Sequence, residues 1–121
     1  IVLRALTQLV EALLRAAGLR RRKDLPAAEQ ALADGLGSLG LPLELLARDA
    51  AATLASLVPV PAKRALVAAA LVELARLREL AGRADEAVEL RLRAEVLEDG
   101  IELEALPELV HDARERLLAE P

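Results

Sequence analysis

The chain has 121 residues, with 20 Asp and Glu against 16 Lys and Arg, a formal net charge of −4 and 55% hydrophobic residues. This length is sufficient for a single hydrophobic core, so we expect residues 1–121 to form one domain. Because cysteine is absent, disulfides, thiolate metal sites and cysteine nucleophiles are excluded, and the cytoplasm is the expected location.

The first predicted helix covers about residues 1–18, where polar residues recur at steps of three and four and therefore share one face. Gly18 and the basic run that follows it are the predicted stop signals, since cations suit the negative end of a helix dipole. A second helix is expected to begin near Asp24, as its cap, with Pro26 in its first turn. The glycines of GLGSLG, residues 35–40, are predicted to end it.

The third helix is predicted to open at Pro42 and to end by Val58, because the prolines of PVP remove backbone donors and disfavour helical geometry before each of them. The fourth runs from Pro61 to about Ala81. Its stretch ALVAAALV is apolar on every side, which is typical of a central helix. The fifth covers about residues 84–98. The sixth runs from about 105 to 119, with Pro107 in its first turn and one apolar stripe, made of Leu106, Leu109, Val110, Ala113 and Leu117.

No stretch shows the sustained period-two alternation of a strand. The predicted fold class is therefore all-α, with about six helices in antiparallel hairpins. A membrane span is not expected, because the longest uncharged run, residues 50–62, is far below the roughly 20 residues that a span requires. The chain begins with Ile rather than Met, so its natural start is expected upstream, and charges at Arg4 and Glu11 interrupt any signal-peptide core.

Residues 80–98, LAGRADEAVELRLRAEVLE, together with the preceding helix, resemble a tetratricopeptide hairpin. The matching positions are Leu71, Leu74, Ala75, Gly82, Ala87 and Ala94, whereas Arg78, Arg91 and Asp99 depart from the pattern. A weaker copy, with matches at Ala16, Leu19, Ala28 and Leu32, lies 59 residues earlier. A regular array repeats about every 34 residues. The resemblance implies a tetratricopeptide-like binding scaffold, and the alternative is an irregular bundle with similar small-residue packing.

Side chains suited to catalysis are few: one His, two Ser and two Thr. His111 has Glu108 and Glu115 one turn away, but these are positions where an amphipathic helix faces solvent. Ser38 lies in GLGSLG, which lacks the Lys of a phosphate loop. Ser56 has no His near it in sequence, so a nucleophile there would have no base. We therefore expect no enzyme activity and no catalytic, cofactor or metal site.

Charge is distributed unevenly, since residues 84–121 hold 12 acids against 4 arginines. Such asymmetry can orient helices within a domain or pair two copies head to tail. The strongest basic feature is the turn Arg20, Arg21, Arg22 and Lys23, which predicts, as the second choice, a small nucleic-acid-associated regulator. Nucleic-acid binding is not the first choice because the chain has no aromatic side chain on which bases could stack.

The first helix carries an apolar arc of about 200°, wider than the stripe of somewhat over 100° that one packing face needs. Leu3, Val10 and Leu14 are left for a further contact, and a second copy of the chain is the simplest candidate. The alternative is that the helix predicted over residues 42–58 or the one over 105–119 covers this flank, or that residues before Ile1 do. The sequence thus favours a non-enzymatic helical protein–protein interaction or scaffold module that self-associates as a homodimer. A third hypothesis is an apolar-ligand pocket between Leu and Ala side chains.

Overall fold

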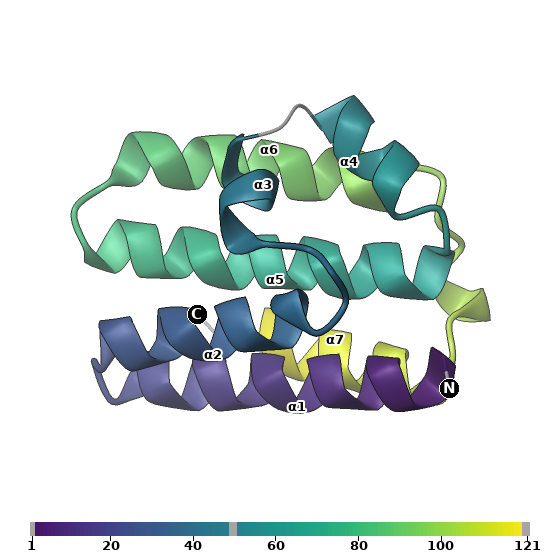
Figure 1. The fold of residues 1–121 in the computed structure, drawn as a ribbon, viewed down its shortest axis with the longest axis horizontal. Helices are drawn as coiled ribbons and strands as arrows, with labels where there is room; N and C mark the ends of the chain where they lie inside the picture. Colours follow the sequence, from purple (N-terminus) through teal and green to yellow (C-terminus); the bar gives the residue numbers. More distant parts are fainter. Residues whose placement is uncertain (1, 49–50, 120–121) are drawn as a thin grey trace.

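The computed structural model of the protein describes the backbone of residues 2–48 and 51–119, and within these ranges it is helical with no strand (Figure 1). The all-α prediction is therefore confirmed. In chain order the elements are α1 (Val2–Arg21), α2 (Leu25–Gly37), α3 (Leu43–Arg48), α4 (Ala51–Leu57), α5 (Pro61–Leu80), α6 (Ala84–Glu98), a short 3-10 turn η1 (Leu103–Ala105) and α7 (Glu108–Leu118).

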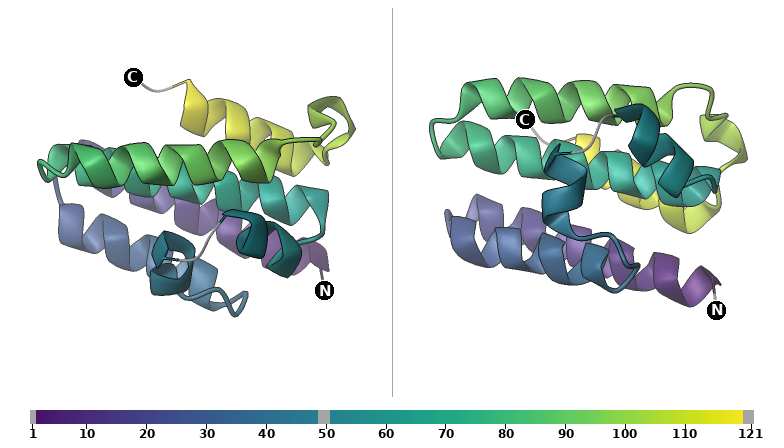
Figure 2. Two further views of the ribbon diagram at one scale, coloured as in Figure 1. Left: turned by 90° about the horizontal axis from the view of Figure 1, so that it is seen from above. Right: turned by 45° about the horizontal axis from the view of Figure 1, so that its top comes forward.

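The helices form two stacked antiparallel hairpins (Figure 1). The hairpin of α1 and α2 lies against α5, which pairs with α6 in the second hairpin. α7 packs behind them, against α1 and α5, whereas α3 and α4 cross the opposite face and α4 packs on α6 (Figure 2). One outer side of α6 is left without a neighbouring helix (Figure 2).

α5 is the central helix, as its apolar sequence predicts. It packs against α1, α2, α6 and α7, and twelve of its residues are buried. The run from Ala65 to Leu71 has no exposed side. Four alanines in this run let neighbouring helices approach closely, so the small side chains set the spacing of the bundle.

Two glycines that were predicted to stop helices lie inside them. α1 continues through Gly18 to Arg21, and the chain then reverses at Lys23, which has a φ of 65°. α2 continues through Gly35 to Gly37. Gly35 is buried, and a Cβ added to it would lie 2.4 Å from the Cβ of Ala12, so it permits close contact of α1 with α2. The role of Gly35 is therefore to allow the two helices to pack closely, and it does not end α2.

Of three other predicted helix boundaries, one is confirmed and two differ. The Asp24 carboxylate accepts a hydrogen bond from the Ala27 amide at 3.3 Å, so the predicted cap of α2 is confirmed. The single helix predicted over residues 42–58 is instead two short helices, α3 and α4. α7 begins at Glu108, and Pro107 precedes the helix rather than lying in its first turn.

The hairpin of α5 and α6 closes through small side chains. Ala75 on α5 and Ala87 and Ala94 on α6 are buried, and Gly82 turns the chain between the helices with a φ of 79°. Positive φ is cheap only for glycine, which explains this residue at the turn. The antiparallel hairpin predicted over residues 61–98 is thus present.

Candidate interaction surface

Three of the exposed large apolar side chains among the described residues lie on the outer side of α6. Val88, Leu92 and Val96 are 58%, 54% and 44% exposed. They recur every four residues, so they form one stripe about 12 Å long on the helix. We call these three residues the α6 stripe.

The stripe is exposed because α6 has two apolar faces and packs through only one of them. The buried face consists of Ala87, Leu90, Ala94 and Leu97. This face packs against α5 and α4, while the opposite side of the helix is uncovered when the molecule is viewed from above (Figure 2). A soluble surface helix normally carries polar residues there, so the second apolar face is what requires explanation.

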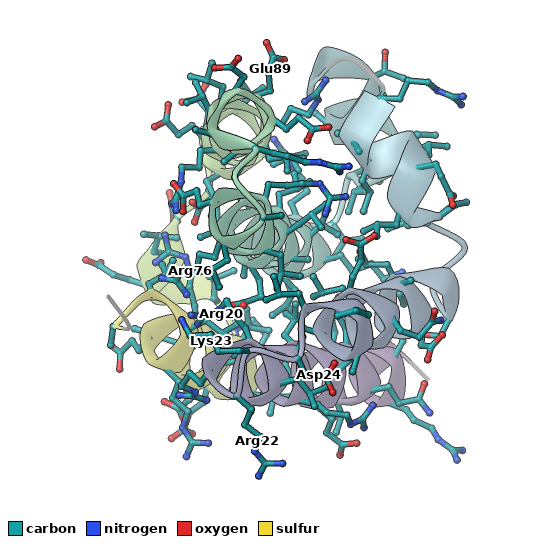
Figure 3. All side chains as sticks on the ribbon, turned by 90° about the vertical axis from the view of Figure 1, so that its left-hand side faces the viewer. Arg20, Arg22, Lys23, Asp24, Arg76 and Glu89 are labelled. Atoms are coloured by element: carbon teal, nitrogen blue, oxygen red, sulfur yellow. The ribbon has the colours of Figure 1, made fainter. Side chains whose placement is uncertain are left out.

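Acidic side chains border the α6 stripe. Asp85, Glu89 and Glu95 are all exposed, and Glu89 lies at the outer edge of the helix in Figure 3. The nearby arginines already have acidic partners: Arg91 donates a hydrogen bond to Glu79 at 2.8 Å, and Arg93 lies 3.7 Å from Glu89. With five acids and two arginines, α6 carries a formal charge of −3. The surface is therefore apolar along its centre and negative at its borders.

The interface predicted on α1 is largely enclosed by the chain itself. Val10 is 6% exposed and belongs to the core, and Leu14 is partly buried against that core. α1 packs against α2, α5 and α7, and of these α7 corresponds to a helix that the alternative named. The side chain of Leu3 lies outside the described part of the structure. Val10 thus has little surface to offer a partner.

One of the four residues of the predicted basic turn, Arg20, is buried. Its guanidinium pairs with the carboxylate of Glu73 on α5. Arg21, Arg22 and Lys23 are exposed, and Arg22 points away from the molecule in Figure 3. Because the Arg20 guanidinium pairs inside the core, the exposed part of the turn consists of Arg21, Arg22 and Lys23.

The Arg20–Glu73 pair belongs to a charged cluster that joins three helices. Glu73 is 1% exposed, and Arg76 lies 3.4 Å from it on the same helix. Arg76 also donates a hydrogen bond to the Leu117 carbonyl of α7 at 2.7 Å. The cluster therefore links α1, α5 and α7, and such buried pairs are costly to break. Figure 3 shows Arg20 and Arg76 close to where these helices meet.

Sequence reasoning missed this cluster, although one signal was present. Glu73 is the only charged residue between Arg64 and Arg76, in a helix that is apolar on all sides. A lone acid in such a setting requires a cationic partner. The sequence does not identify Arg20, which lies 53 positions away.

Neither His111 nor the groove beside α2 has the properties of a catalytic, metal or apolar-ligand site. The His111 side chain is 46% exposed, with Nδ1 at 3.5 Å from a Glu115 carboxylate oxygen, as expected for a solvent-facing pair. Across the described residues, no group of three or more His, Asp or Glu is placed to hold a metal ion.

A groove of about 530 Å³ lies between α2, α3 and the end of α5. Its lining includes Glu29, Glu44, Arg78 and Arg83 as well as apolar residues, which does not suit the hypothesis of an apolar ligand.

In comparisons with protein-family models, curated proteins and solved structures, nothing matches this chain. The tetratricopeptide resemblance therefore stays a prediction that depends on its residue pattern. None of the helices that the structure describes combines the length and the apolar character needed to cross a bilayer.

Proposed function

We propose that the protein is a non-enzymatic helical interaction module that binds a protein partner through the α6 stripe. The observation that carries this proposal is the exposure of Val88, Leu92 and Val96 on one side of a helix whose other side is fully packed. Contiguous exposed apolar side chains bordered by polar residues are typical of interaction sites.

Burial of the α6 stripe supplies only part of the free energy that a stable complex needs. Full burial of a Val or Leu side chain stabilises a complex by roughly 1.5–3 kcal/mol. Because the three side chains are about half exposed, a partner that covers them gains on the order of 2–4 kcal/mol from the stripe. Polar contacts at its borders then determine which partners bind.

The location of the binding surface differs from the one expected on α1. Self-association remains part of the proposal only if a second copy contacts α6, since Val10 is enclosed by the chain's own helices. A nucleic-acid-associated role has weaker support, because Arg20 pairs with Glu73 and is withdrawn from the basic turn.

A comparison of three baits tests the proposal: the wild type, Leu92→Ser and, as a matched control, Leu118→Ser. Leu118 is 40% exposed on α7 and is not part of the α6 stripe. We expect a defined set of proteins that the wild type and Leu118→Ser retain and that Leu92→Ser loses. Circular dichroism should show that all three baits are folded. Identical sets on all three baits would mean that α6 is not the binding surface.

A further inference from the structure

We infer that the occupant of the α6 stripe is an amphipathic helix of another protein, with its own apolar stripe bordered by Lys or Arg. This inference rests on the proposed function and adds the partner's chemistry. It is carried by two properties of α6: the shape of the apolar surface and the sign of the charges beside it.

The shape of the surface favours a helix. Residues spaced by four form a ridge along α6, and such a ridge packs between the corresponding ridges of a second helix that crosses at about 50°. An extended peptide gains most of its affinity by pairing its backbone with the edge of a sheet. Within its length, α6 uses its backbone groups in its own hydrogen bonds and offers no such edge.

The charges favour a cationic partner. Asp85 and Glu95 are exposed beside the stripe. Glu89 is also exposed and pairs with Arg93, and Arg91 pairs with Glu79. The acidic character extends beyond α6, because residues 84–121 carry 12 acids and 4 arginines. Lys or Arg residues that flank the partner's apolar stripe would lie opposite these acids, and the complementary charge would speed association and fix the orientation.

A second copy of the chain fits this surface less well. Two α6 helices would bring together two segments of charge −3. Anionic lipid would be repelled by the same carboxylates.

The probe for this inference is a labelled synthetic 18-residue helical peptide with three Leu spaced by four and Lys on both flanks. Its matched control keeps the three Leu and replaces each Lys with Glu. Fluorescence anisotropy would measure binding to the full chain. We expect the Lys peptide to bind at least ten-fold more tightly than the Glu peptide.

Protein variants then separate the apolar contact from the charged one. Leu92→Ser should weaken binding of the Lys peptide at least ten-fold, and the combined change Glu89→Gln and Glu95→Gln should weaken it several-fold. Leu118→Ser should bind as the wild type does. Equal binding of the two peptides, or an affinity that Leu92→Ser leaves unchanged, overturns the inference.

Self-association has a distinct signature. If light scattering shows a mass that rises with protein concentration, and Leu92→Ser abolishes the rise, the occupant is a second copy. That result overturns the inference of a cationic partner and leaves the proposed interaction surface in place. The proposed function itself fails only in the bait comparison, where Leu92→Ser would retain the same proteins as the wild type.

Discussion

Gly35 determines how closely α1 and α2 approach. A Cβ at this position would lie 2.4 Å from the Cβ of Ala12, and a methyl group fixed to a helix backbone cannot rotate away. Gly35→Ala should therefore destabilise the protein by about 1–3 kcal/mol, although alanine is the better helix former. Thermal denaturation should show a midpoint several degrees lower.

Two variants serve as controls for this effect. A methyl group added at Gly18 would have nothing within 4 Å of it, so Gly18→Ala should raise stability by about 0.5–1 kcal/mol through helix propensity alone. Combining Ala12→Gly with Gly35→Ala moves the methyl group to the other helix and should restore most of the lost stability. If the pair is as unstable as the sum of its single changes, the contact between the helices is not the cause.

Single positions were predictable from sequence when their role is local. Asp24 was identified correctly because a cap requires only its own helix. Gly35 was misread as a helix stop, because the need for glycine there comes from contact with Ala12, a residue of another helix. Arg20 was misread in the same way, since its partner Glu73 lies on α5. A role that depends on a distant residue leaves no spacing pattern in the sequence.

At the scale of elements, the buried charged cluster joins α1, α5 and α7. Glu73→Leu removes the acid and leaves Arg20 buried without its carboxylate partner. We expect a loss of about 3–5 kcal/mol in the free energy of unfolding. Adding Arg20→Met should recover part of this loss, because the buried charge that has lost the Glu73 carboxylate is then also removed. Chemical denaturation of the single and double variants measures the coupling.

An exposed ion pair gives the matched control for the cluster. Arg83 lies 3.4 Å from Glu86, and both side chains are more than half exposed. Arg83→Gln should therefore change stability little. If Glu73→Leu is as mild as Arg83→Gln, the cluster does not hold the three helices together.

The packing of α6 on α5 can be tested on its two faces. Ala87 is buried, and a larger side chain there would push the helices apart. Ala87→Leu should cost about 1–3 kcal/mol. Glu89, whose side chain is 69% exposed, faces solvent, so Glu89→Leu should change stability by less than about 0.5 kcal/mol. Equal shifts of the thermal midpoint would contradict the assignment of the two faces.

For α6, the helix bounds could be predicted from the sequence, but the face that stays exposed could not. α5 and α6 were predicted close to their observed bounds, and the prolines that precede α5 are a signal that acts locally. Which apolar face of α6 would stay uncovered depends on where α4 and α5 pack, and no periodicity encodes that choice. For this reason the exposed surface was expected on α1 and is found on α6.

At the scale of the whole molecule, burial is concentrated at the centre and declines toward α3 and α4. α5 has twelve buried residues, whereas α3 buries Leu46 and α4, among its residues whose burial is described, buries Leu54. Helices of this length have no stability of their own in water. Among their described residues, they are held chiefly by Leu46 and Leu54, with Leu43, Leu45 and Ala55 partly buried against the core.

This gradient predicts how the molecule opens. Amides of α5 should exchange with solvent only through global unfolding, whereas those of α3 and α4 should exchange through local opening at lower free energy. In hydrogen-exchange measurements at low denaturant, exchange in α3 and α4 should be nearly independent of denaturant, because little surface is exposed when they open. Leu46→Ala should accelerate exchange in α3 by removing its only buried side chain, with a much smaller effect on α5. If α3 and α4 exchange as slowly as α5 and with the same dependence on denaturant, then these helices are held as firmly as the core, and the molecule unfolds as one unit.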